Sequence, residues 1–157
     1  MARGLALLLR SRLESGGYRY LLARPDWPPR VTPMGSIGRI ALIEGTLLRA
    51  GKAKPKDLRK AVETFFRHED LLDQAVQKQT RYGNEGCHVY FAWYHLCEAL
   101  TLLPGASAKP FKDKAAAHIL SRRRPDGSWW DSKRAGPRAA TAMALLALAC
   151  LEGRIER

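Results

Sequence analysis

The feature that most constrains the fold is a short motif that occurs twice in the chain. Near the carboxyl end, Arg124 to Trp130 has the character of a charged helix end, an Asp-Gly turn and an aromatic pair, and the apolar run Gly136 to Leu151 follows it. Near the amino end, Gly16-Gly17-Tyr18 aligns with Gly127-Ser128-Trp129. A turn that is repeated before an apolar helix predicts an array of helical hairpins, in which each unit buries its apolar face against its neighbours.

Three apolar segments are expected to form the inner helices of this array. They centre near Ile43, His95 and Leu145, at a spacing of roughly 50 residues that is typical of stacked hairpins. We therefore predict one domain of three repeats, approximately residues 1–51, 52–104 and 105–157. More polar segments separate the apolar ones and should form helices with one apolar stripe.

The fold class predicted from this pattern is all-α, with about three hairpins and six or seven helices. The last apolar segment, Ala139 to Leu151, has Thr141 as its only polar side chain, so we expect it to be enclosed on all sides. No apolar run reaches the ~18 residues that a membrane span needs, and we therefore predict no membrane-spanning helix.

Composition limits the partners that the chain could have. It carries 27 Lys and Arg against 15 Asp and Glu in 157 residues, a formal charge of +12. The basic residues are spread out, as on a solvated surface, and we expect no specific nucleic-acid binding. Cys87, Cys97 and Cys150 are odd in number and lack close spacing, which favours reduced, mostly buried thiols and a cytoplasmic location.

The carboxyl-terminal motif resembles a known superfamily. Arg124-Pro125-Asp126-Gly127-Ser128-Trp129, followed by the Thr-Ala-x-x-Leu pattern from Thr141 to Leu148, is similar to the repeat of terpenoid cyclases and protein prenyltransferase β-subunits. The resemblance implies that the chain forms part of an α/α toroid.

The departures from that repeat argue against catalysis. The resemblance places the acid motif of the cyclases at Pro137 to Ala140, where this chain has no acid, and Asp-x-Asp-Asp occurs nowhere in the sequence. The resemblance to prenyltransferases implies a zinc ion held by Asp, Cys and His ligands. The candidates here are Cys87, His88, His95 and Cys97, and these four side chains cannot converge on one zinc ion from a single helix. We therefore predict no catalytic residue, no metal and no cofactor.

The array is also shorter than the rings of the family. Active members close a ring of about five or more hairpins, so a second copy or a partner chain could complete a toroid here.

A ligand site is expected at the amino ends of the inner helices. If these helices run parallel, three helix N-termini and the side chains of Arg39, His88 and Arg138 form a cationic mouth over an apolar bowl. An isoprenoid or acyl-type ligand with an anionic head and an apolar tail would suit such a site. Glu44 projects about 140° from Arg39 on the same helix, so it faces either a partner or the cavity. The candidate ligand-binding residues are Arg39, Glu44, His88, Tyr90, Trp93, His95 and Arg138, with Tyr90 and Trp93 expected to face the cavity.

These observations leave three functions open. The first is a non-catalytic module that binds an apolar or amphipathic ligand, or a protein partner, in its concave face. The second is an isoprenoid-processing enzyme completed by another chain. The third is a basic scaffold that binds nucleic acid.

Overall fold

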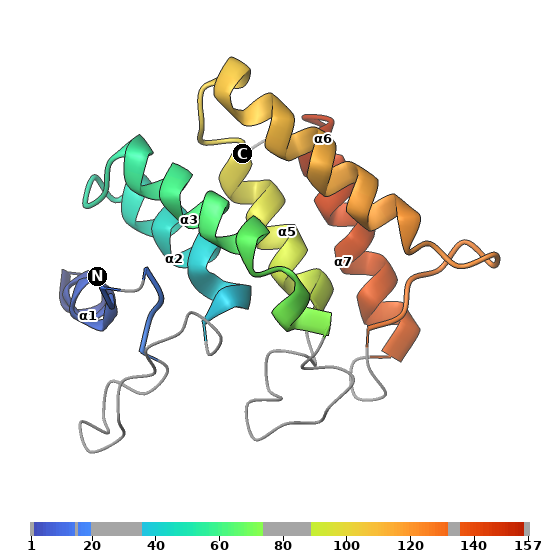
Figure 1. The fold of residues 1–157 in the computed structure, drawn as a ribbon, viewed down its shortest axis with the longest axis horizontal. Coiled ribbons are helices and arrows are strands. Elements are labelled where there is room, and N and C mark those ends of the chain that lie inside the picture. Colours follow the sequence, from blue (N-terminus) through green and yellow to red (C-terminus); the bar gives the residue numbers. More distant parts are fainter. Residues whose placement is uncertain (1, 15, 20–35, 74–88, 132–135, 156–157) are drawn as a thin grey trace.

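Within the part of the chain that it describes, the computed structural model has five helices in two layers and a sixth at one end (Figure 1). The structure describes residues 2–14, 16–19, 36–73, 89–131 and 136–155. The helices are α1 (Ala2–Ser11), α2 (Ile37–Arg49), α3 (Pro55–Arg67), α5 (Val89–Leu100), α6 (Gly105–Ser121) and α7 (Gly136–Leu151). The all-α prediction is confirmed. That the array is part of a toroid remains a prediction.

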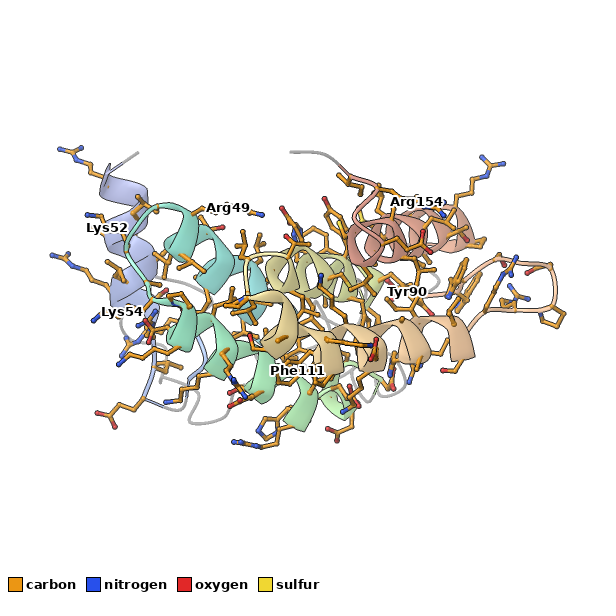
Figure 2. The ribbon with its side chains drawn as sticks, turned by 90° about the horizontal axis from the view of Figure 1, so that it is seen from above. Arg49, Lys52, Lys54, Tyr90, Phe111 and Arg154 are labelled. Atoms are coloured by element: carbon orange, nitrogen blue, oxygen red, sulfur yellow. The ribbon has the colours of Figure 1, made fainter. Side chains whose placement is uncertain are left out.

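The inner layer consists of α2, α5 and α7, which lie side by side and run in the same direction (Figure 1). The outer layer consists of α3 and α6, which run in the opposite direction and cover one side of the inner layer. Figure 2 shows the two layers from above, with the other side of α2, α5 and α7 left uncovered by α3 and α6. The expectation that the three apolar helices run parallel in one layer is met.

Helix α1 departs from this alternation. Figure 1 shows it end-on, whereas α3 and α6 run along the layers. The segment that follows α1 folds back on itself through a bridge between Arg12 and Tyr18. The first of the three predicted units therefore carries its turn and its inner helix, but its polar helix does not lie in the outer layer.

The turn that the sequence predicts to occur twice has the same hydrogen bond in both copies. Gly16 donates to the Leu13 carbonyl at 3.0 Å, and Gly127 donates to the Arg124 carbonyl at 2.9 Å. Both glycines have positive φ, 81° and 83°, a conformation that favours glycine. Each turn ends on a buried aromatic ring, Tyr18 or Trp129.

The attachment of each turn to its inner helix is also repeated. The backbone N–H of Tyr18 donates to the Ser36 hydroxyl just before α2, at 2.9 Å. The backbone N–H of Trp129 donates to the Thr141 hydroxyl in α7, at 3.0 Å. A hydroxyl therefore ties each turn to its inner helix, although Ser36 precedes α2 and Thr141 lies in the second turn of α7.

Helices α2 and α7 end in the same way. Gly51 and Gly153 follow them with φ of 67° and 71°. The next N–H, from Lys52 or Arg154, donates back into the last turn of its helix, to Leu47 or Ala149. This left-handed glycine cap satisfies carbonyls that the helix leaves free, and it ends both helices sharply.

Small residues let the inner helices pack closely. A Cβ placed on Gly45 of α2 would lie 3.6 Å from the Ala99 Cβ of α5, and one on Gly38 would lie 3.4 Å from the Ala92 Cβ. On α7 the buried positions are Ala140, Ala144, Ala147 and Cys150. These small side chains let the axes of the inner helices approach closely.

Aromatic rings fill the space between the layers. Phe65 of α3 meets Trp93 of α5 edge-on at 5.0 Å, and Phe66 of α3 stacks on Phe111 of α6 at 5.6 Å. His118 of α6 stacks on Trp93 at 4.0 Å. The outer layer is thus held by large rings, and the inner layer by small residues.

The expectation that α7 is enclosed on all sides is wrong. Leu145 and Leu146 are 53% and 40% exposed, and Ala139 and Ala142 are exposed as well. The reason is position, since α7 is the last inner helix and no described helix lies beyond it. An all-apolar composition predicts burial only for a helix that has neighbours on both sides.

We predict that Ala144→Leu lowers the free energy of unfolding by about 1–3 kcal/mol, because the added atoms have no space in a fully buried position. Ala139→Leu is the matched control on the exposed side of α7 and should change stability by less than about 0.5 kcal/mol. Urea denaturation of both variants measures the difference. Equal losses would mean that the inner layer is not closely packed around α7.

Candidate functional site

The candidate site is the surface of α2, α5 and α7 that points away from α3 and α6, here called the inner face. Helical spacing places one stripe of each helix on it. The stripes are Arg39, Leu42, Thr46 and Arg49 on α2, Phe91, His95 and Glu98 on α5, and Ala139, Met143 and Leu146 on α7. These side chains are half-buried or exposed, and none belongs to the core.

A charged network crosses the inner face between α2 and α5. Glu98 accepts a hydrogen bond from Arg49 at 3.0 Å, and its other oxygen lies 2.9 Å from His95 Nδ1. Figure 2 shows Arg49 on the uncovered side of α2. Because Glu98 engages Nδ1, it fixes the orientation of the imidazole on the face.

Aromatic rings surround His95 on α5. The Phe91 ring meets the imidazole edge-on at 4.3 Å, and the Tyr94 ring lies 4.8 Å from it. Phe91 and Tyr94 are both half-buried, so their rings are partly accessible. The centre of the inner face therefore offers an apolar, aromatic floor beside an arginine and a carboxylate.

The predicted cationic mouth is only partly described. Arg39 lies in the first turn of α2 on the inner face, half-buried and engaged in an interaction of its own. Arg138 lies in the first turn of α7 but on the exposed stripe opposite the buried positions, and so points away from α5. His88 lies outside the described residues.

Glu44 has its partners inside the fold. It is 5% exposed, and its carboxylate accepts hydrogen bonds from the Tyr18 hydroxyl and from Arg12, the latter at 2.7 Å. Burial, with the hydrogen bond to Glu44, raises the pKa of Tyr18 above its usual value of 10.0. Glu44 ties the first turn to α2 and lies off the inner face.

A cleft of about 100 Å³ opens beside Glu44, on the side of α1 and α3. It is lined by Arg12, Leu13, Glu14, Gly16, Glu44, Asp57, Lys60, Ala61 and Thr64. Two cations and three carboxylates nearly balance, and the volume suits about three water molecules. An isoprenoid chain does not fit there.

Tyr90 and Trp93 do not face a cavity, contrary to expectation. They are 2% and 1% exposed and point from α5 toward the outer layer, and Figure 2 shows Tyr90 between the layers. Burial raises the pKa of Tyr90 to about 12, and the carboxylates of Asp131 and Asp73 act in the same direction. The sequence of α5 is apolar on most sides of the helix. It therefore gave no indication of which side the outer layer covers.

Of the inner-face residues, only Arg39 and His95 were predicted from the sequence, and the missed ones include Arg49, Phe91 and Glu98. Phe91, His95 and Glu98 stand four and three residues apart, and that spacing marks one stripe of a helix. The sequence could therefore show that these three residues share one side of α5. It could not show that Arg49 pairs with Glu98, since Arg49 comes from another helix.

Metal chemistry finds no support within the described ranges. No group of three or more His, Cys, Asp or Glu side chains there could hold a metal ion. Cys97 and Cys150 are buried free thiols, and burial raises the pKa of both. Cys87, the remaining cysteine of the expected zinc set, lies outside the described residues.

Comparisons with models of known protein families, with curated proteins and with solved structures found no match. None of the helices in the described part of the chain is both long and apolar enough to cross a membrane.

We predict that Glu44→Ala costs about 2 kcal/mol of unfolding free energy, because it leaves Tyr18 and Arg12 without their shared partner. Glu63→Ala removes a carboxylate from an exposed ion pair on α3 and should cost less than about 0.5 kcal/mol. Thermal or urea unfolding provides the comparison. A loss no greater than that of Glu63→Ala would contradict the anchoring role of Glu44.

His118 should make stability depend on pH. Burial against Trp93, together with the charge of Arg122, lowers its pKa to about 4 from the usual 6.5. The folded chain therefore resists protonation of His118. Because the unfolded chain binds this proton more readily, the free energy of unfolding decreases as pH falls from 6.5 to about 4. Above pH 6.5 the stability contributed by neutral His118 is fully present.

Partial solvent exposure limits the size of this effect to on the order of 2 kcal/mol. His118→Gln should lose less stability between pH 7 and pH 4.5 than the wild type, as measured by urea unfolding at both values. An identical pH dependence in the two proteins would contradict the assignment.

Proposed function

We propose that the chain is a non-catalytic binding module, of terpenoid-cyclase and prenyltransferase-like ancestry, whose inner face binds an amphipathic ligand. The ligand would have an apolar body and an anionic group, as an isoprenoid diphosphate or an acyl phosphate has. The observation that carries the proposal is the parallel run of α2, α5 and α7, which gives one face an aromatic floor and one common end of helix N-termini.

The apolar body is assigned to the floor. Phe91 and Tyr94 of α5 lie between Leu42 of α2 and Met143 of α7, and these side chains are all partly accessible. Rings and aliphatic side chains that are already packed lose little conformational freedom when an apolar chain covers them. A flat aromatic floor accepts an isoprenoid or an acyl chain without a polar partner.

The anionic group is assigned to the amino ends of the inner helices. Each inner helix has at least twelve residues, and its first N–H groups and dipole favour a negative charge. Arg39 lies in the first turn of α2 and adds a full positive charge on the same face. Together these groups favour a phosphate or carboxylate at that end of the face.

Catalysis is not part of the proposal. The chain has no Asp-x-Asp-Asp motif, and its first α7 turn carries Pro137 and Arg138 where the cyclase repeat would have acids. Glu98 engages both His95 and Arg49, so it is committed to a network on the face. Binding is the activity that these residues support.

The test measures binding of farnesyl diphosphate, farnesol and inorganic diphosphate separately, by titration calorimetry below the micelle-forming concentration. Farnesyl diphosphate should bind most tightly. Phe91→Ala should weaken binding of both farnesyl compounds roughly tenfold, since it removes part of the floor. Arg39→Ala should weaken binding of farnesyl diphosphate roughly tenfold and leave farnesol unchanged.

Arg59→Ala is the matched control, because Arg59 is an exposed arginine on the outer layer. Circular dichroism checks that each variant keeps its helices. The proposal fails if none of the three compounds shows saturable binding. It also fails if Arg59→Ala weakens binding as much as Arg39→Ala does, since the attraction would then reflect net charge alone.

A further inference from the structure

The two ends of the helical array carry the exposed apolar side chains of the described residues. Of the six large hydrophobic side chains that are most exposed, Leu7 and Leu9 lie on α1 at one end. The other four lie at the opposite end, namely Leu120, Trp130, Leu145 and Leu146. Arrays of stacked hairpins normally end in a polar surface, which keeps the last apolar face out of water. Among the described residues, the α7 end of this array exposes large apolar side chains to water.

The outermost stripe of α7, here called the α7 ridge, has an ordered sequence. Its residues are Arg138, Ala142, Leu145 and Ala149 of α7, and Glu152, which directly follows the helix and forms an exposed ion pair with Arg154 at 2.7 Å. Successive members are four, three, four and three residues apart, so they lie in one line along the helix. All are exposed except Ala149, which is half-buried, and they stand opposite the buried positions of α7.

The α7 ridge is complementary to itself when it is reversed. Leu145 stands at its centre, with Ala142 and Ala149 on either side, while Arg138 and Glu152 lie seven residues before and after Leu145. Seven residues are about 10.5 Å of helix. In an antiparallel pair centred on Leu145, Arg138 of each chain therefore meets Glu152 of the other chain.

We propose that two copies of the chain pair side by side through the α7 ridge, antiparallel, about a two-fold axis at Leu145. Small residues flank the central leucines and allow the two helices to approach closely. The antiparallel arrangement also opposes the helix dipoles, and it forms the pair of Arg138 and Glu152 twice. This inference does not depend on the proposed ligand.

Neighbouring groups extend the contact beyond one helix. The backbone N–H of Trp129 is bound to Thr141, so the segment before α7 lies against this helix, and the next residue, Trp130, is 47% exposed. Leu146 adjoins the ridge on the side of the inner face. Exposed aromatic and leucine side chains next to a helix ridge are typical of an interface.

The net charge of the chain opposes pairing, and the small area of the ridge limits its strength. Each copy has a formal charge of +12, so two copies repel at long range. At 0.15 M salt the screening length is about 8 Å, and the close pairs dominate. A single-helix ridge is smaller than a standard interface, and we expect a dissociation constant in the micromolar range.

The experiment is sedimentation equilibrium of the full chain at 0.15 M salt, over about 5 to 500 µM. The wild type should shift from 17.6 kDa toward twice that mass as the concentration rises. Arg138→Glu and Glu152→Arg should each weaken the dimer at least tenfold, because each places like charges in contact twice. The double variant carrying both changes should restore the wild-type constant, since it exchanges the two charges of the same pair.

Leu145→Glu should also abolish the dimer, because it brings two carboxylates together at the axis. Leu7→Glu is the matched control at the other end of the array and should leave the dimer unchanged. Circular dichroism verifies the helical content of every variant, all of which change exposed side chains.

Three results would overturn the proposal. One is a mass of 17.6 kDa at every concentration. Another is a double variant that stays as weak as the single ones, which excludes the antiparallel register. The last is a dimer lost in Leu7→Glu and retained in Arg138→Glu, which indicates head-to-tail contact between α1 and α7.

Discussion

The close approach of α2, α5 and α7 is the constraint on which the rest of the structure depends. Gly45 faces Ala99 across α2 and α5, and α7 presents Ala140, Ala144 and Ala147 to the interior. Small residues on facing sides let three parallel helices form one layer. Because such a layer has no room for large rings between its helices, the large rings lie between the layers, where Phe65, Trp93 and Phe111 pack.

This division explains where the functional candidates lie. The side of α5 that meets the outer layer is filled by Tyr90 and Trp93, so these rings stabilise the fold and are closed to a ligand. The opposite side of α5 needs no packing partner in the outer layer, and it carries Phe91, His95 and Glu98. An inner helix that is covered by a layer on one side only packs that side against the fold, and only its uncovered stripe remains for binding.

Much of the architecture could be predicted from local signals. The repeated turn was visible because a left-handed glycine followed by a buried aromatic needs particular residues, and Gly16 and Gly127 supply them with nearly equal φ. The order of polar and apolar helices followed from their composition. The exposure of Leu145 was not visible, because a helix's own composition does not say how many neighbours it has.

The partners of Glu44, which are Arg12 and Tyr18, could not be predicted from the sequence either. Arg12, Tyr18 and Glu44 come from two segments that the chain brings together only after the first turn folds back. The orientation of α1 was beyond reach for the same reason, since ten helical residues carry no signal for the angle at which they meet the layer. Contacts within one helix or turn can be inferred from spacing, and contacts between segments require the fold.

The two proposed surfaces meet on α7. Leu146 lies about 100° around the helix from Leu145, so the first belongs to the inner face and the second to the α7 ridge. A two-fold axis perpendicular to the inner layer leaves both inner faces on the same side of a dimer. The two leucines of one helix turn then connect the ligand surface to the copy–copy surface. Any change in ligand affinity on pairing must be matched by an equal change in pairing affinity when the ligand is bound, because the coupling free energy between two sites is reciprocal.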